Sequence, residues 1–296
     1  MKKLLFIYNP QAGTGQIRGR LAGMLDVFTR RGWLVTVHPT QGKADATSIA
    51  TRLGGQFDRI VCCGGDGTLH EVVTGLMALP RRPVLGYIPA GTTNDFSRNL
   101  KLPKSYDGRA EVAAAGIPRP CDIGQFNEAY FVYVAAFGAF TDVAYATPQG
   151  FKNMFGHLAY LMEGMTRLGS LKSYRLTATH DGGVVEGDFL FGMVSNTISV
   201  GGFIDLPADQ VALDDGLLEV ILVRTPTSAA QLQAIITALL TQRLGNTDGI
   251  LGLHTGHLSI TCQEPLPWTL DGEFGGNPSQ AEIQNCQQAV TIVYGE

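Results

Sequence analysis

The stretch VCCGGDGTLHE, Val61 to Glu71, decides the fold. It joins an apolar run suited to a buried parallel strand to a segment with helical spacing, and a glycine-rich loop separates the two. The helical spacing is carried by Leu69, Val72, Val73, Leu76 and Leu79. Glycine permits positive φ angles and close backbone approach, so amides at Gly64, Gly65 and Gly67 can converge on an anion beside a helix N-terminus. The stretch therefore predicts a strand, a phosphate-binding loop and a helix.

Asp66 lies inside this loop and needs its own explanation. A carboxylate would repel a bound phosphate unless a metal ion or a proton lay between them, and this favours magnesium together with a nucleotide. The alternative is a tight turn that binds nothing, in which Asp66 or Thr68 caps the helix. The loop alone leaves both interpretations open.

The same order of strand, loop and helix recurs through the N-terminal part. Strands are expected at 4–8, 33–38, 58–63 and 84–88, and helices at 16–31 and 44–53. This alternation predicts a doubly wound parallel sheet. Three of the strands end in polar, glycine-bearing loops, at 9–15, 64–68 and 89–96. Because open parallel sheets bind ligands at the carboxyl ends of their strands, we predict one nucleotide pocket shared by the three loops.

Helix signals become rare after about residue 121. Strands expected at 130–135, 174–180 and 187–195 alternate with turns, which predicts an antiparallel β-sandwich. A helical segment is also expected at 229–240, and another at 151–168 carries a wide apolar stripe. For that stripe, core packing is favoured over contact with a lipid or a partner.

We therefore predict an α/β fold of two domains. Residues 1–121 form an N-terminal doubly wound parallel-sheet nucleotide-binding domain, residues 122–284 form a C-terminal antiparallel β-sandwich domain, and the active site lies in the cleft between them. The last segment, 285–296, either closes the sandwich or completes the first sheet.

Composition narrows the class of protein. The chain has 296 residues, 45% of them hydrophobic, and a net charge of −4 without a Lys/Arg-dense run, which argues against a nucleic-acid partner. Its five cysteines are odd in number and contain no CxxC pair, which is typical of reduced thiols in a cytosol. The N-terminal apolar run is too short for a signal peptide, and the run at 129–140 is too short for a membrane span.

Several motifs together resemble the soluble bacterial diacylglycerol kinase family. They are NPxxG at 9–13, GGDGT at 64–68, PxGTxNDF at 89–96, DxG at 122–124, Gly201-Gly202, Asp215-Gly216-Leu217 and Asp271-Gly272-Glu273. They occur in the family's order and span essentially the whole chain. GGDG by itself is shared with NAD kinases and phosphofructokinases, whereas PxGTxNDF and the late DGE are narrower signals.

The resemblance implies that the protein binds ATP and Mg²⁺ at the carboxyl edge of the parallel sheet. The implied nucleotide contacts are Asn9, Pro10, Gln11, Ala12, Gly13, Thr40, Gly64, Gly65, Asp66, Gly67, Thr68, Leu69, His70, Glu71, Gly91, Thr92 and Asn94. Phosphoryl transfer needs positioned amides and a divalent ion, so Asp66 and Asp95 are candidates for organising catalytic magnesium. The alternatives are that Asp95 caps the following helix and that Asn94 makes an Asx turn.

The resemblance also implies two acidic sites in the second domain. Asp215, with the backbone carbonyls of Ala212 and Leu217, would hold a structural magnesium, although a hairpin turn alone explains an Asp-Gly pair. Asp271 and Glu273 are candidates for the base that accepts the proton of the acceptor hydroxyl, and the sequence does not choose between them. The alternative for both is a surface turn.

Three residues depart from the family pattern: Ala12 replaces a common serine, His70 a common asparagine and Ser97 a common alanine. None of these changes removes a carboxylate. The imidazole of His70 could contact a phosphate or the substrate, but a histidine in the first turn of a helix is more often ordinary polar surface.

The function predicted from these residues is an ATP-dependent lipid kinase. It would transfer the γ-phosphoryl group of ATP to the hydroxyl of diacylglycerol or a related lipid and give phosphatidic acid. We expect a cytoplasmic protein with transient peripheral contact at the inner face of the membrane, and the oligomeric state stays open, a homodimer included. Cations that could assist this contact are Arg18, Arg20, Arg30, Arg31, Arg81 and Arg82. The alternatives are an NAD-kinase-like transferase and a non-catalytic nucleotide-binding regulatory protein.

Overall fold

The computed structural model describes residues 1–13, 15–138, 172–197, 199–200, 204–205, 212–241 and 247–295. They form two compact units, Met1–Ile123 with Gln287–Glu296, and Gly124–Cys286. The helix predicted at 151–168 and the glycine pair Gly201-Gly202 lie outside the described residues.

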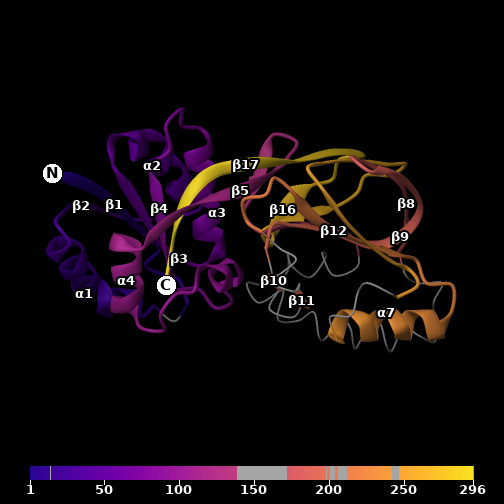
Figure 1. Cartoon of the computed structure of the whole chain (residues 1–296), viewed down its shortest axis with the longest axis horizontal. Coiled ribbons are helices and arrows are strands. Elements are labelled where there is room, and N and C mark those ends of the chain that lie inside the picture. Colours follow the sequence, from indigo (N-terminus) through magenta and orange to yellow (C-terminus); the bar gives the residue numbers. More distant parts are fainter. Residues whose placement is uncertain are drawn as a thin grey trace. The chain divides into compact units, whose positions relative to one another are not determined.

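The first unit is built on a parallel sheet with the strand order β2-β1-β3-β4-β17 (Figure 1). Its elements are β1 (Lys2–Tyr8), α1 (Ile17–Arg30), β2 (Trp33–Pro39), α2 (Asp45–Leu53), η1 (Gly54–Gln56), β3 (Arg59–Gly64), α3 (Asp66–Met77), β4 (Val84–Pro89), η2 (Asp95–Leu100), α4 (Tyr106–Ala115) and the first part of β5 (Ile117–Phe126). The expected alternation of strands and helices is confirmed, and one helix, α4, was not predicted.

Because helices cover both faces of this sheet, its central strands β3 and β4 are buried along almost their whole length. On one face α1 and α4 contribute Met24, Phe28 and Ala113 to a core that they share with Phe6 and Val61. On the other side α2 packs so closely on α3 that a Cβ added at Gly75 would lie 2.6 Å from the carbonyl oxygen of Thr47 (Figure 1). The sheet is therefore packed closely by its helices, next to the loops that follow its strands.

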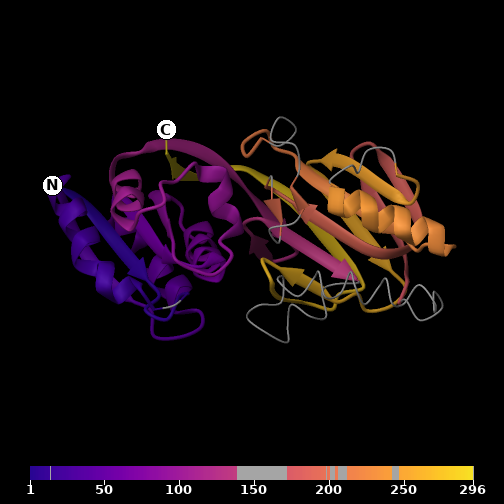
Figure 2. The same cartoon turned by 90° about the horizontal axis from the view of Figure 1, so that it is seen from below.

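The second unit is antiparallel, as predicted. Its elements are β6 (Ala129–Phe131), β7 (Val134–Gly138), β8 (Tyr174–His180), β9 (Gly183–Ser195), β10 (Ser199–Val200), β11 (Ile204–Asp205), β12 (Leu218–Arg224), α7 (Ala229–Thr241), β13 (Ile250–Thr255), β14 (His257–Cys262), β15 (Trp268–Leu270), β16 (Glu273–Gly276) and the first part of β17 (Gln280–Tyr294). The predicted β-sandwich is confirmed (Figure 2). Its core includes Trp268, and the centroid of the Trp268 ring lies 4.9 Å from the ring centroids of both Phe126 and Phe137.

One predicted strand was wrong in its details. The segment 130–135 is not continuous: β6 ends at Phe131 and β7 begins at Val134. The two residues between them, Val132 and Tyr133, donate backbone hydrogen bonds to the carboxylate of Asp271. At the chain's end, β17 pairs in antiparallel fashion with β14, and farther along its Ile292 lies parallel to Leu85 of β4.

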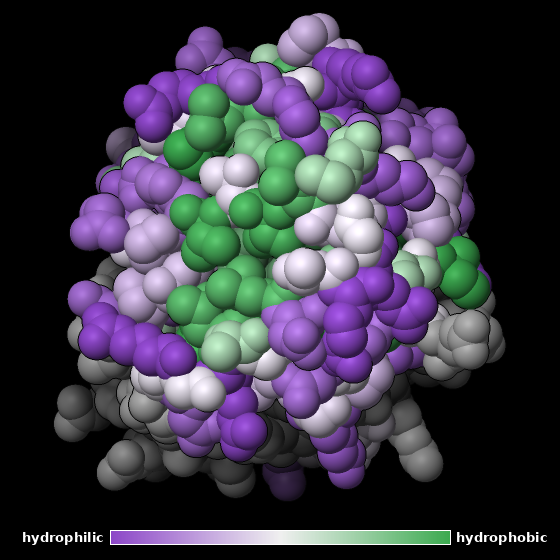
Figure 3. Space-filling view, turned by 90° about the vertical axis from the view of Figure 1, so that its left-hand side faces the viewer, coloured by the Kyte–Doolittle hydropathy of each residue, from purple (hydrophilic) through white to green (hydrophobic). Residues whose placement is uncertain are grey.

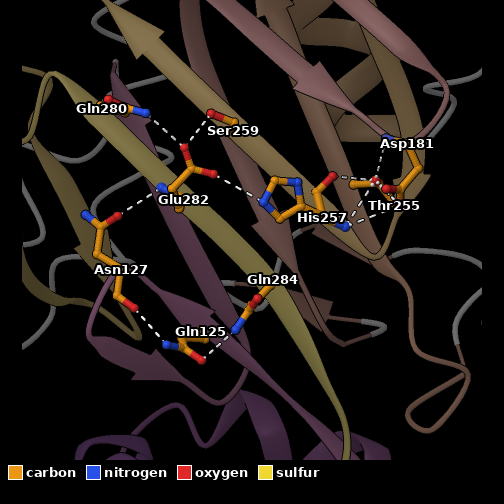
Figure 4. Close-up of polar contacts among 9 residues, drawn as sticks. All are labelled: Gln125, Asn127, Asp181, Thr255, His257, Ser259, Gln280, Glu282 and Gln284. Carbon is orange, nitrogen blue, oxygen red and sulfur yellow. Dashed lines mark hydrogen bonds and ion pairs between the residues drawn. The ribbon is translucent and has the colours of Figure 1, made fainter.

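A polar network connects β14 and β17 in the second unit (Figure 4). The Glu282 carboxylate accepts hydrogen bonds from Ser259 Oγ at 2.7 Å and Gln280 Nε2 at 3.1 Å, and it forms an ion pair with His257 at 3.2 Å. The hydrogen bond from Ser259 is the main cause that lowers the pKa of Glu282, partial burial opposes it, and Gln280 and His257 add to the lowering. The network therefore joins neighbouring strands by charge-assisted hydrogen bonds.

Candidate active site

The three predicted loops meet at the carboxyl edge of the parallel sheet. The Asn9 N–H donates to the Cys63 carbonyl at 2.9 Å, and the Ala90 N–H donates to the Gly64 carbonyl at 2.8 Å. A Cβ added at Gly13 would lie 2.4 Å from the Ala90 carbonyl oxygen. The loops after β1, β3 and β4 are thus joined through their backbones.

Two glycines make the closest approach. A Cβ on Gly91 would lie 2.6 Å from Gly65 Cα and 2.8 Å from Asn94 Oδ1, so only glycine fits there. The Asn94 side chain closes its own loop, because its Oδ1 accepts from the Gly91 N–H and its Nδ2 donates to the Gly91 carbonyl, both at 2.8 Å. Asn94 itself has a φ of 53°. Its side chain therefore shapes the loop through Gly91, three residues before it.

Asp66 connects the second loop to the third. It is the first residue of α3, and its Oδ2 accepts a hydrogen bond from the Asp95 N–H at 3.1 Å. Asp95 is 1% exposed, whereas Asp66 is half-buried. The N-cap of α3 is Gly65, and no side-chain cap hydrogen bond is formed there. The carboxylate of Asp66 therefore organises the neighbouring motif and does not serve as a simple N-cap.

Two residues after the loop have structural partners. The Glu71 carboxylate accepts from the N–H groups of Ala44 at 2.8 Å and Ala46 at 3.1 Å, which caps the N-terminus of α2 from a different helix. Leu69 is completely buried in the core. The positions of Glu71 and Leu69 next to the loop are therefore explained by the cap of α2 and by core packing, without contact with a nucleotide.

The remaining predicted contacts surround the loops. Gln11, Gly13, Gly67 and Thr92 are exposed, and Asn9, Pro10, Ala12, Thr40, Gly65 and His70 are half-buried. The Thr40 N–H continues the ladder to the Tyr8 carbonyl at 2.9 Å, and Thr68 Oγ1 lies 3.5 Å from Asn9 Nδ2. This arrangement suits a phosphate with a divalent cation. The backbone of the glycine-rich loop and the positive end of α3 lie next to the carboxylate oxygens of Asp66, which are the kind of ligand that such a cation prefers.

Two supporting residues were not anticipated from the sequence. Arg109, on the unpredicted α4, donates to the Pro89 carbonyl at 2.7 Å. The Tyr87 hydroxyl donates to the Gly64 carbonyl at 3.2 Å and lies 3.4 Å from Asn94 Oδ1. For Tyr87 the sequence offered one signal, which is a tyrosine hydroxyl within the otherwise apolar strand 84–89.

Cysteines beside the loop do not provide a nucleophile. All five cysteines are free thiols. Burial is the main cause that raises the pKa of Cys63 to about 12, and burial also raises the pKa of Cys62. Both thiols therefore stay protonated near neutral pH.

In the second unit, the Asp271 carboxylate is a structural clamp. It is 5% exposed, and it accepts backbone hydrogen bonds from Val132 at 2.7 Å, Tyr133 at 2.9 Å and Val134 at 3.1 Å. Asp271 and Gly272 have φ values of 50° and 84°, as expected for the two-residue hairpin turn that joins β15 to β16. Glu273, the next residue, is exposed. The two acidic residues of this turn thus have different environments.

The predicted structural metal site is an exposed turn. Asp215 Oδ1 accepts from the Leu217 N–H at 2.9 Å, and the Leu217 carbonyl accepts from Asn285 Nδ2 at 2.9 Å. Ala212 is exposed. Across the part of the chain that the structure describes, no cluster of three or more His, Cys, Asp or Glu residues could hold a metal ion. A magnesium here would depend on carbonyl oxygens and retained waters, which that ion accepts.

The two units match two known domain families. Residues 3–126 match the diacylglycerol kinase catalytic domain, and residues 135–293 match the YegS C-terminal NAD kinase beta sandwich-like domain. The fold and the loops therefore define a kinase of the lipid-phosphorylating class, as the sequence predicted.

Known proteins confirm the family over the whole chain. The chain is 36% identical over 278 residues to a diacylglycerol kinase of Bacillus subtilis (strain 168), covering 93% of this chain and 91% of that protein. It is 35% identical over 302 residues to a diacylglycerol kinase of Staphylococcus aureus (strain bovine RF122 / ET3-1), covering 98% and 92%. The chain belongs to the soluble bacterial diacylglycerol kinase family.

Solved structures agree with this assignment. A crystal structure of a diacylglycerol kinase from Bacillus anthracis str. Sterne has a TM-score of 0.76 at 24% identity, covers 99% of this chain and 97% of that chain, and shares its fold. A second crystal structure from that strain has a TM-score of 0.81 at 26% identity and covers 99% and 98%. Among the described helices, none has the length and apolar character needed to cross a membrane.

Proposed function

We propose that the protein transfers the γ-phosphoryl group of ATP to the hydroxyl of diacylglycerol or a related lipid and forms phosphatidic acid. Together with membership of the family, the observation that carries this proposal is the joining of the GGDGT and PAGTTND loops through Asp66 and Asp95. Such a junction holds backbone amides and carboxylates in fixed positions, and phosphoryl transfer depends mainly on positioned charge.

The ATP phosphates bind the backbone of Gly64–Thr68 at the N-terminus of α3, with contacts from the 9–13 loop, Thr40, Gly91, Thr92 and Asn94. The first turn of α3 favours anions because its amides point at the loop. Asp66 and Asp95 would hold Mg²⁺, directly or through water, and the ion would supply positive charge against the phosphate oxygens. Their shared hydrogen bond would fix the spacing of the two motifs.

Glu273 is the better candidate for the base. Both Asp271 oxygens already accept backbone hydrogen bonds, so that carboxylate serves best as a positioning group for the turn. The exposed Glu273 can accept the hydroxyl proton while the new O–P bond forms and ADP leaves. Asp215, with the carbonyls of Ala212 and Leu217, would hold a structural Mg²⁺, with retained waters as the further ligands.

The proposed lipid acceptor implies a cytoplasmic protein that contacts the membrane peripherally. Of the six arginines that could assist, Arg30 pairs with Asp26, Arg31 pairs with Glu111, and Arg82 donates to three backbone carbonyls. Arg18, Arg20 and Arg81 are exposed and are the better candidates for contact with anionic headgroups.

The test is transfer of labelled phosphate from ATP, with Mg²⁺, to mixed micelles that contain diacylglycerol, sphingosine or ceramide. We expect label in diacylglycerol. Label in none of the three lipids would refute the lipid-kinase proposal. In a parallel reaction with NAD as the acceptor, label in NAD instead of lipid would identify a soluble-nucleotide kinase. ATP binding without any transfer would indicate a regulatory nucleotide-binding protein.

A matched pair of variants tests the base. Glu273→Gln should lower kcat by about 10²–10⁴-fold with nearly wild-type thermal stability, since the amide keeps the size of this exposed side chain but cannot accept the proton. Asp271→Asn should lower the free energy of unfolding by about 1–3 kcal/mol, because an amide cannot accept all three backbone hydrogen bonds. Full activity in Glu273→Gln would exclude Glu273 as the base.

A further inference from the structure

Tyr87 lies inside the parallel sheet, two residues before the end of β4. Its side chain is 1% exposed, and its partner in the neighbouring strand β3 is Cys62, which is completely buried. Figure 3 views the side of the first unit at which β2 and α1 lie, where an apolar band is rimmed by hydrophilic residues. The strands β1 and β3 separate β4 from β2, so Tyr87 acts on groups inside the unit and not on that surface.

The hydroxyl of Tyr87 faces one acceptor from each of two loops. It donates to the Gly64 carbonyl at 3.2 Å and lies 3.4 Å from Asn94 Oδ1. The orientation of the Asn94 amide is set by its own loop, because its Oδ1 accepts from the Gly91 N–H and its Nδ2 donates to the Gly91 carbonyl. A hydroxyl carries one proton, so this tyrosine places a single donor between the 64–68 loop and the 89–96 loop.

Both acceptors also have a backbone donor. The Gly64 carbonyl accepts from the Ala90 N–H at 2.8 Å, and Asn94 Oδ1 accepts from a backbone N–H of its own loop at 2.8 Å. Loss of the tyrosine hydroxyl therefore leaves neither oxygen without a hydrogen bond, and it should change the stability of the fold little. What would be lost is a link between the tip of the 89–96 loop and the end of β3.

We propose that Tyr87 is a positioning residue for the nucleotide, and that its hydroxyl holds the two loops at the separation that the ATP phosphates require. This inference rests on the proposed binding of ATP at these loops. Backbone amides bind a phosphate well only when their loops are held in place, and buried hydrogen bonds from a rigid strand provide such support. Tyr87 holds the loops from within the sheet, whereas Asp66 holds them through the Asp95 N–H.

The experiment measures ATP binding to the full-length protein by isothermal titration calorimetry, with Mg²⁺ and without lipid. Tyr87→Phe keeps the ring and removes only the hydroxyl. Its dissociation constant for ATP should rise about two- to tenfold, which is the effect of one hydrogen bond. In the transfer assay, the KM for ATP should rise similarly, whereas kcat and the KM for the lipid should stay at their wild-type values, because only nucleotide binding is weakened.

A matched control is Tyr174→Phe, which removes a tyrosine hydroxyl from β8 in the second unit. Tyr174 is 4% exposed and its ring packs against Phe137, so the two variants change equally buried tyrosines. Tyr174→Phe should keep the wild-type dissociation constant for ATP. Melting temperatures with and without ATP should show a smaller ATP-dependent increase for Tyr87→Phe than for the wild type or the control.

An unchanged ATP dissociation constant in Tyr87→Phe would overturn the proposal. A melting temperature that falls equally with and without ATP would do the same, since the hydroxyl would then support only the fold. A wild-type protein that binds no ATP would overturn both this inference and the proposed function. If the wild-type protein binds ATP but labels no lipid, the lipid-kinase proposal fails, and the calorimetric comparison still decides the role of Tyr87.

Discussion

The carboxylate of Asp66 accepts a hydrogen bond from the backbone N–H of Asp95 at 3.1 Å, although the two residues belong to different loops. This side-chain contact connects the GGDGT motif to the PAGTTND motif, in addition to the backbone hydrogen bond from Ala90 to Gly64. It means that the first carboxylate has two separable properties, an oxygen that accepts the hydrogen bond and a negative charge that suits a cation.

Substitutions at Asp66 should separate these properties. Asp66→Asn keeps an acceptor oxygen but loses the charge, so we expect wild-type stability and a loss of Mg²⁺-dependent activity of about 100-fold or more. Asp66→Ala should lose activity and, in addition, about 1–2 kcal/mol of unfolding free energy. Urea denaturation and phosphate transfer measure the two effects. An active Asp66→Asn enzyme would remove this residue from the metal site.

The close approach of Gly65 and Gly91 predicts that alanine is not tolerated at position 91. Gly91→Ala places a Cβ 2.6 Å from Gly65 Cα, and we expect a loss of about 1–3 kcal/mol together with weaker ATP binding. Gly67→Ala is the matched control, because a Cβ there meets no atom within 4 Å. It should keep full stability, and a fall in its ATP affinity by calorimetry would place the nucleotide directly over this residue. Equal stability of the two variants would contradict the packing argument.

Glu71 should matter for stability more than for nucleotide binding. Its carboxylate caps α2 through the N–H groups of Ala44 and Ala46, so Glu71→Ala should lower the free energy of unfolding by about 1 kcal/mol. Glu71→Gln, which keeps an acceptor oxygen, should lose less. Thermal unfolding with and without ATP checks both. Lower ATP affinity at unchanged stability would favour the predicted nucleotide contact instead.

The network at Glu282 predicts a stability that falls in acid. Because the pKa of Glu282 is lowered in the folded state, its contribution is present above the ordinary value of 4.5 and is lost as the pH falls through the lower folded value. Glu282→Gln should therefore flatten the pH dependence of unfolding below about pH 4.5, by less than about 1 kcal/mol since the pair is partly exposed. Ser259→Ala should have the same effect in part. Parallel pH profiles for wild type and Glu282→Gln would disprove the assignment.

Local sequence was sufficient for the parallel sheet and its loops. Apolar strands that end in glycine and are followed by helical spacing predict β3, its loop and α3 from the residues at 58–79 alone, because each signal lies within one short window. The helix α4 was missed because Tyr106–Ala115 contains Gly108 and has little amphipathic character. The break between β6 and β7 was missed because the carboxylate that accepts from its backbone N–H groups lies at position 271, far along the chain.

The sequence by itself determined the fold class, the family and the residue types available for phosphoryl transfer, since motif spacing and hydrophobic periodicity are local properties. Only the tertiary structure decided how these residues are used. In the structure the Asp271 carboxylate accepts hydrogen bonds from the 132–134 backbone, whereas Glu273 is exposed. Glu71 caps α2, and Asp66 accepts a hydrogen bond from Asp95. Those outcomes depend on contacts between residues far apart in the chain, and the order of the described strands determines which of those residues meet.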